Sequence, residues 1–227
     1  MFVASLVIPA ASLGSPLAPC GVPNQIYCQA NDQTGNAVTS QYDTSRGGYG
    51  GFATVYDNFT LTQGYHVQGI TWVGAYIMGA PAPISAWNAR FYSDSVGTIG
   101  QFLAVVPLAG NGGETFLGTF GPLALDEYLY SMSFPSIELG PGTYWVSLVP
   151  DLDFPPEWLW VTGTGGDNFS YQDFFQQLDP LPYDFAFALD GTPITAPTPE
   201  PASLLLMGTS LLGAFGYGRR RLVSTKD

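Results

Sequence analysis

The sequence predicts an all-β fold, specifically a two-sheet β-sandwich of jelly-roll type, from its composition and its alternating hydrophobic pattern. The 227 residues include 28 Gly, 19 Pro and 15% aromatic residues. Gly and Pro disfavour long helices and mark tight turns, whereas aromatic residues favour strands. With 46% hydrophobic residues, the chain can bury a core of ordinary size. A closed barrel is the lesser alternative.

Alternation along the body, assigned to residues 19–192, predicts roughly eight to ten short strands. In GITWVGAYI, for example, Trp72 and Tyr76 face one way, and Val73 and Ala75 face the other. Gly, Pro and Asp turns such as LGPGT and GTGGDN separate such stretches. We expect strands at about 53–62, 69–77, 86–93, 100–107, 114–121, 128–139, 142–149, 158–162 and 185–189.

The chain begins with an apolar stretch, Phe2–Leu13, that is typical of a secretory signal peptide. We assign residues 1–18 to a truncated signal peptide, because no basic residue precedes the apolar stretch and a true start upstream of Met1 is therefore favoured. A lipobox ending at Cys20 is the alternative, but Pro19 departs from the small residue that this motif needs.

Cys20 and Cys28 are the only cysteines of the chain. In an oxidising periplasm they are expected to form a disulfide that closes a small loop. Zinc binding is disfavoured because the two thiols are accompanied by a single, distant histidine, His66.

Three features follow one another at the C-terminus. The Pro-rich linker 193–201 contains Pro199-Glu200-Pro201, and the uncharged apolar run 202–218 follows it. As a helix this run would be about 25 Å long, marginal for a membrane core of roughly 30 Å. Arg219, Arg220 and Arg221 open the tail 219–227, which the positive-inside rule assigns to the cytoplasm. A buried core helix is disfavoured because the run lacks a polar face.

The order Pro-Glu-Pro, apolar helix and arginine cluster resembles the PEP-CTERM sorting signal of Gram-negative bacteria. The resemblance implies export, an inner-membrane-anchored precursor and recognition by an exosortase, with Pro199, Glu200, Pro201 and Arg219, Arg220, Arg221 as the sorting signal. It also implies a host that makes exopolysaccharide, and a final place on the cell surface or in a biofilm matrix. Tails of this kind also carry the name of an ice-binding-protein C-terminal domain, but these residues predict no ice binding.

The body also resembles β-sandwich modules found upstream of such tails, through aromatic stretches such as GPGTYWVSL and EWLWV. This resemblance implies a sandwich and carries no catalytic residues.

The charge of the body disfavours nucleic-acid partners. The net charge is −12, and only Arg46 and Arg90 are basic before the tail. Such an acidic field repels phosphate backbones.

We expect that the body, residues 19–192, has no enzymatic activity. His66 stands without a nucleophile motif, so a hydrolase triad has little support. An exported glycan-active hydrolase is the alternative, with Asp151, Asp153 and Glu157 as candidate acid and base. Carboxylates so near in sequence rarely flank a sugar from both sides.

Two ligand hypotheses remain for a structural, adhesive or carbohydrate-binding body. Asp151 and Asp153 could bind calcium together with Asp167 if their loops converge, and no other cofactor is expected. Exopolysaccharide could stack on Trp158 and Trp160, which share one strand face, and on Trp145 of a neighbouring strand. Core packing is the competing hypothesis for these tryptophans, because large aromatic residues in a sandwich are usually buried.

Overall fold

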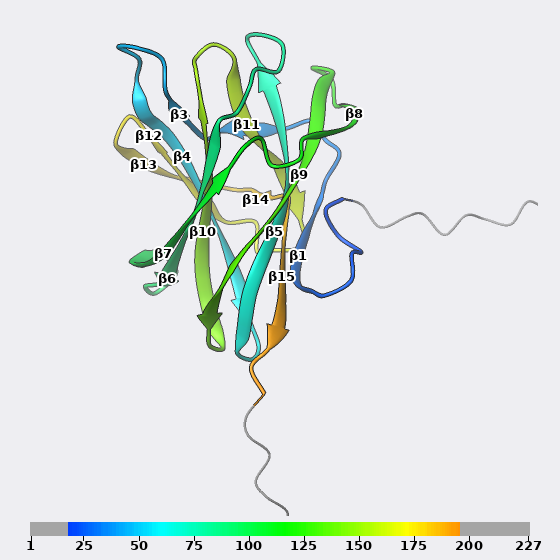
Figure 1. Cartoon of the computed structure of the whole chain (residues 1–227), viewed down its shortest axis with the longest axis vertical. Helices are drawn as coiled ribbons and strands as arrows, with labels where there is room; N and C mark the ends of the chain where they lie inside the picture. The colour runs from blue at the N-terminus through cyan, green and yellow to red at the C-terminus, as the bar shows by residue number, and fades with distance from the viewer. Residues whose placement is uncertain (1–17, 196–227) are drawn as a thin grey trace, which may run out of the picture. The chain divides into compact units, whose positions relative to one another are not determined.

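The computed structural model describes residues 18–195, and within them every regular element is a strand. The strands form two sheets that face each other across a common core (Figure 1). The predicted all-β, two-sheet sandwich is therefore confirmed. No helix among these residues has the length and apolarity that a membrane crossing needs. The expected signal peptide, linker motif, membrane helix 202–218 and basic tail lie outside the described residues.

One sheet, called sheet I, contains eight strands. Seven of its strands lie side by side in the order β14 (Asp184–Phe185), β11 (Glu157–Thr164), β1 (Gln25–Asn31), β15 (Phe187–Pro193), β5 (Tyr65–Ile77), β9 (Leu125–Leu139) and β8 (Thr115–Phe120). The eighth strand, β2 (Ala37–Thr39), pairs with β11. Strand β5 is long enough to pair with β15 along its first half and with β11 along its second half.

The other sheet, called sheet II, contains seven strands. Their order is β13 (Gln177–Leu181), β12 (Ser170–Phe174), β4 (Gly50–Leu61), β3 (Gln41–Asp43), β10 (Gly142–Leu152), β6 (Ala86–Asp94) and β7 (Ile99–Ala109). Strands β4 and β10 also pair with each other beyond the short β3. Every pair in the two sheets is antiparallel except β3 with β10.

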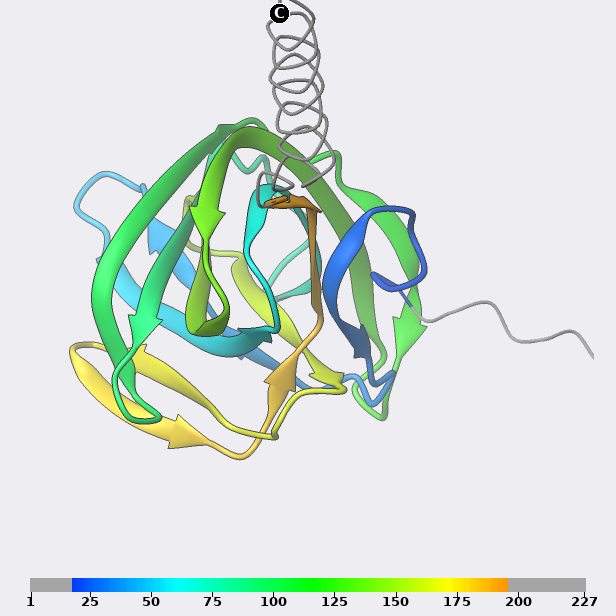
Figure 2. The same ribbon diagram turned by 90° about the horizontal axis from the view of Figure 1, so that it is seen from below.

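The core between the sheets is unusually aromatic. Trp87 of sheet II meets Trp72 and Trp158 of sheet I at ring-centroid distances of 4.7 and 4.9 Å. Viewed from below, the two sheets curve around this centre (Figure 2). Edge-to-face contacts of this kind add to the gain from burying large apolar surfaces, so the aromatic residues tie the two layers together.

Sheet I is buried on both faces along β5. Trp72 and Tyr76 point into the main core, whereas Val73 and Ala75 belong to a second apolar cluster on the other face. This confirms the alternation predicted for GITWVGAYI. Ala18 and Leu117 pack against this second cluster, so the outer face of the sheet is partly covered here.

Candidate ligand-binding groove

A groove of about 540 Å³ lies where β2 and β11 of sheet I meet β12 of sheet II. Its lining includes the buried Leu159 and also Leu123, Phe174 and Tyr183. The last three side chains are exposed, which gives the groove two accessible aromatic rings. The remaining lining residues are Gly35, Asn36, Ala37, Val38, Thr39, Ile77, Leu125, Thr162 and Gln172, so no lining residue within 18–195 is charged.

Hydrogen bonds hold the polar part of the groove in place. The Nε2 atom of Gln172 donates to the Thr39 carbonyl oxygen at 2.9 Å, which joins β12 to β2. The backbone N–H of Thr162 donates to the Asn36 carbonyl oxygen at 3.0 Å. These bonds order the surrounding backbone, and the exposed Asn36 side chain remains at the groove mouth.

Two glycines allow the loops beside the groove to touch. Gly35 and Gly121 both have positive φ, at 72° and 69°. A Cβ on Gly35 would lie 2.6 Å from the Phe120 carbonyl oxygen, and one on Gly121 would overlap the Thr34 carbonyl oxygen. Because L side chains rarely adopt this backbone conformation, and because there is no space for one, both positions require Gly.

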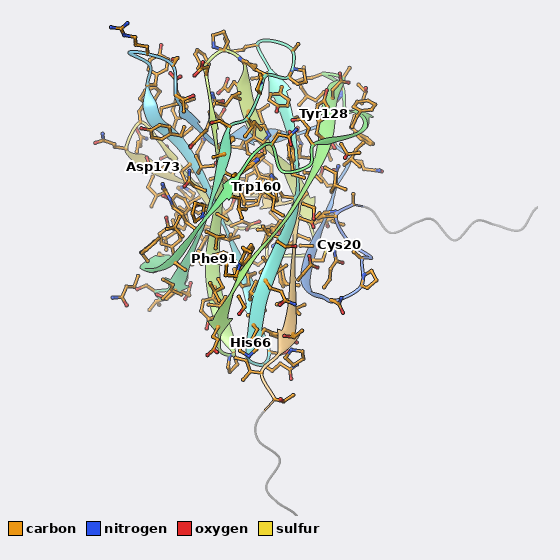
Figure 3. All side chains as sticks on the ribbon, viewed as in Figure 1. Cys20, His66, Phe91, Tyr128, Trp160 and Asp173 are labelled. Atoms are coloured by element: carbon orange, nitrogen blue, oxygen red, sulfur yellow. A yellow bond between two sulfur atoms is a disulfide. The ribbon has the colours of Figure 1, made fainter. Side chains whose placement is uncertain are left out.

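The proposed tryptophan platform is wrong. Trp158 and Trp160 have no exposed surface, and Trp145 is 1% exposed. Trp158 and Trp160 point into the core, and Trp160 is seen at the centre of the sandwich in Figure 3. Trp145 lies on the other face of sheet II, where Tyr171 covers it and its Nε1 donates to Asp94 at 2.9 Å. The competing hypothesis of core packing is correct for Trp158 and Trp160, whereas Trp145 is buried on the outer face of sheet II beneath Tyr171.

The proposed calcium set does not come together. Asp153 accepts a hydrogen bond from Thr44, and Asp151 accepts one from Asn88. Asp167 instead accepts a hydrogen bond from the side chain of Asn58. Asn58 lies opposite Trp145 in the sheet, and Trp145 is six positions before Asp151 on β10. Six positions in a strand span roughly 20 Å. Within residues 18–195 no three His, Cys, Asp or Glu side chains are placed to hold a metal ion.

Asp167 belongs to a cluster of carboxylates at the edge of the core. Asp57 is fully buried, and its oxygens accept the backbone N–H groups of Asn58 and Phe185 at 2.8 and 2.7 Å. Burial raises the pKa of Asp57 well above its usual range, and the charge of Asp184 raises it further. Burial likewise raises the pKa of Asp184. None of these carboxylates forms a salt bridge with a described basic residue.

Cys20 and Cys28 form a disulfide in the structure, with Cα atoms 5.7 Å apart. Cys28 lies in β1, so the bond fastens the start of the described chain to sheet I. The lipobox alternative requires the Cys20 sulfur for a lipid, and that sulfur is already bonded to Cys28.

The sequence predicted none of the residues that line the groove. They come from segments far apart in the chain, and no short motif joins Asn36, Gln172 and Tyr183. The one feature of the sequence that these residues share is that all of them are uncharged, although the chain as a whole is acidic. The candidate acids of the alternative hydrolase are not among the residues that line the groove. Glu157 is near it, since it accepts a hydrogen bond from the lining residue Thr39.

Comparisons with known proteins concern the C-terminal segment. Residues 197–221 match the model of the PEP-CTERM protein-sorting motif. The match includes Pro199-Glu200-Pro201 and the three arginines, and it gives no support to the ice-binding designation. Searches of curated proteins and of solved structures found no match.

Proposed function

Because the chain carries a PEP-CTERM sorting motif, and is thus an exported protein that a Gram-negative bacterium sorts by exosortase, we propose that its sandwich is a non-catalytic module that binds neutral glycans of the extracellular matrix. The observation that carries this proposal is the uncharged groove with two exposed aromatic walls. Export would bring the protein to the extracellular matrix, where such glycans occur.

The chemistry of the groove matches that of a sugar. Phe174 and Tyr183 offer ring faces for the apolar C–H face of a pyranose, and Asn36 offers an amide for its hydroxyl groups. A few polar groups set among apolar walls are typical of small-ligand sites. The groove volume is also in the ordinary range for such sites.

The charge of the protein favours a neutral glycan over an acidic one. Acidic residues outnumber basic ones by 18 to 6, and four of the six basic residues lie in the last nine positions. An anionic polysaccharide would be repelled by this field, whereas a neutral one would not. The absence of charge from the described groove lining fits a ligand that is recognised by stacking and by neutral hydrogen bonds.

The composition of the groove supports a role without catalysis. Glycoside hydrolysis needs a pair of carboxyl groups on either side of the scissile bond. Among the described residues, the groove lining contains no carboxylate and no histidine. We therefore propose a structural or adhesive role, in which the protein attaches to matrix polysaccharide without cleaving it.

We further propose that the precursor is held in the inner membrane by the apolar run 202–218 before the exosortase acts. The matched motif supports this order of events. The mature sandwich would then reside on the outer surface or in an exopolysaccharide matrix.

Calorimetric titration with short neutral oligosaccharides, prepared from the matrix of the producing cells, tests the groove. We expect binding by the mature sandwich and a loss of about tenfold in Tyr183→Ala, because one stacking partner is removed. Phe116→Ala, which truncates an exposed ring of β8 outside the groove, should bind as the wild type does. No binding by the wild type, or release of shortened sugars during the titration, would contradict the proposal.

A further inference from the structure

The hairpin between β12 and β13 has an unusual turn. Phe174 pairs with Gln177, so the two-residue loop is Phe175-Gln176, and φ is 50° and 68° at these residues. Positive φ at both loop positions defines a type I′ turn, for which Asn-Gly is strongly preferred. A bulky residue in this conformation is an outlier, and such outliers gather at functional sites. Phe175 therefore suggests a role for its side chain.

Phe175 belongs to a group of rings that we call the aromatic tip, namely Tyr49, Phe52, Phe154, Phe174 and Phe175. The rings meet edge to face, with centroids 5.7 Å apart for Tyr49 and Phe175 and 4.9 Å apart for Phe174 and Phe175. Tyr49 is 61% exposed and Phe175 is 54% exposed. The contacts hold the rings in place, while much of the surface of Tyr49, Phe174 and Phe175 remains available to a ligand.

The aromatic tip is at the end of the sandwich opposite to Pro193. Strand β4 begins beside Tyr49 and ends at Leu61, and Pro193 pairs with Tyr65 just after the next turn. The length of β4 therefore separates the two ends, roughly 35–40 Å. Figure 1 shows the β3–β4 hairpin at the top of the sandwich and the end of β15 at the bottom. The tip is thus far from the point where the chain leaves the sandwich.

Phe174 connects the tip to the groove, because its side chain lines the groove and its ring also contacts Phe52 and Phe175. We propose that the aromatic tip is an extended subsite, over which a neutral polysaccharide chain continues after it leaves the groove. This inference rests on the proposed glycan binding and assigns the tip to the polymer rather than to a single sugar unit. Stacking on several rings suits a repeating ligand, since each sugar presents a similar apolar face.

The charged groups around the tip are mostly acidic. Arg46 is exposed in the β3–β4 loop, but Asp153 and Asp173 adjoin Phe154 and Phe174 in the chain, and Asp43 accepts the backbone N–H groups of Tyr49 and Phe154. This arrangement disfavours an anionic polymer or an anionic membrane surface. A second copy of the chain would bring a like-charged acidic body to the tip, which long-range repulsion disfavours.

Binding of ligands of different length tests the proposal. The ligands are the neutral matrix polysaccharide and its fragments of about three sugar units, and the variants are Tyr49→Ala and Phe175→Ala. We expect both variants to bind the short fragments as the wild type does and to bind the polymer about tenfold more weakly. Phe175→Tyr keeps a ring at the turn and should retain polymer binding, whereas Phe116→Ala is the matched control for loss of an exposed ring.

The possible results separate this inference from the function on which it rests. Wild-type affinity for the polymer in both folded tip variants would overturn the subsite and leave the groove intact. Failure of the wild type to bind either ligand would overturn the glycan proposal itself. If the variants lose concentration-dependent self-association in sedimentation and keep polymer affinity, the tip is a contact between copies and the subsite is again overturned. Thermal unfolding of each variant verifies that it is folded.

Discussion

Gly121 illustrates how one residue without a side chain shapes the groove. Its positive φ and its contact with the Thr34 backbone bring the loop that carries Leu123 against the loop that carries Asn36. An added Cβ would meet a main-chain atom, which cannot turn aside as a flexible side chain could. The wall of the groove is therefore sensitive to this position.

We predict that Gly121→Ala lowers the free energy of unfolding by about 3 kcal/mol, because strain at positive φ and a backbone clash act together. Gly110→Ala is the matched control: φ is 85° there, and nothing lies within 4 Å of the added Cβ. It should cost only about 1 kcal/mol. Urea unfolding of both variants measures the difference, and equal losses would show that the contact with Thr34 is unimportant.

Asp57 makes stability depend on pH in a direction that differs from that of most paired carboxylates. Burial raises its pKa in the folded state above the unfolded value of about 4. Folding therefore favours the protonated form of this group. Its contribution to stability is complete below about pH 4 and is lost as pH rises through the folded-state pKa.

We predict that the free energy of unfolding of the wild type falls as pH is raised from about 4 toward neutrality. Asp57→Asn removes the titrating group and should make this slope shallower. The variant should also be less stable than the wild type at acidic pH, because the two backbone N–H groups donate to different oxygens of Asp57 and Asn has only one side-chain oxygen. Asp179→Asn, at an exposed site, is the control and should keep the wild-type slope. A wild-type slope in Asp57→Asn, from denaturant unfolding at several pH values, would rule out this role for Asp57.

At the scale of elements, the β12–β13 hairpin retains a turn that its residues disfavour. Gln176 has φ of 68°, and its neighbour Phe175 has φ of 50°. Glycine adopts such a conformation without strain, whereas other residues pay a cost. Two unfavourable residues in one turn are unexpected unless their side chains serve a purpose, and only the ring of Phe175 has packing partners among the aromatic tip.

We predict that Gln176→Gly raises the free energy of unfolding by about 0.5–1 kcal/mol, because it relieves strain and leaves the ring of Phe175 in place. Thermal and urea unfolding measure the change, and polysaccharide affinity should stay as in the wild type. Gln177→Gly, one position later and within β13, is the control and should destabilise, since Gly weakens strand interiors. Destabilisation by Gln176→Gly would show that the turn is not strained.

The same hairpin shows where sequence-based prediction stops. The strand at 69–77 could be predicted because GITWVGAYI is a short run of apolar and β-favouring residues, which is typical of a strand that is buried on both faces, as β5 is. Strands β12 and β13 were missed because SYQDFFQQLDPL contains no Asn-Gly or Asp-Gly pair to mark a turn. Strand β1 was missed because Gln25 and Gln29 interrupt its apolar pattern. Gln29 is nevertheless buried in the structure, where its side chain donates a hydrogen bond to the Asn58 carbonyl oxygen of the other sheet.

At the scale of the whole molecule, alternation predicts which residues oppose each other on a strand, but it does not predict which face the opposite sheet covers. Trp158 and Trp160 were correctly assigned to one face, and that face proved to be the core. The groove depends on how β2, β11 and β12 meet, which no single segment encodes. The sorting motif could be identified directly, because its residues are contiguous.

We predict that the protein recovered from surface and medium fractions of the native host lacks everything beyond about Glu200. The physical reason comes from the sequence: Pro lacks a backbone N–H and disfavours regular structure, so a Pro-rich linker at 193–201 would offer few backbone hydrogen bonds to resist a processing enzyme. Intact-mass measurement locates both ends of the chain and any added group. Full retention of residues 202–227 in the membrane fraction would instead indicate a permanent anchor.

Strand β15 also determines how the sandwich responds to mechanical load. It lies between β1 and β5, and Pro193 at its end is where the chain leaves the sandwich. A load on a ligand at the opposite end, resisted at Pro193, pulls β15 lengthwise. The hydrogen bonds to both neighbours run perpendicular to the strand, so they are sheared together instead of opening one by one. If the sandwich binds a polymer as proposed, a sandwich held in this way would resist unfolding when flow or cell movement drags on that polymer.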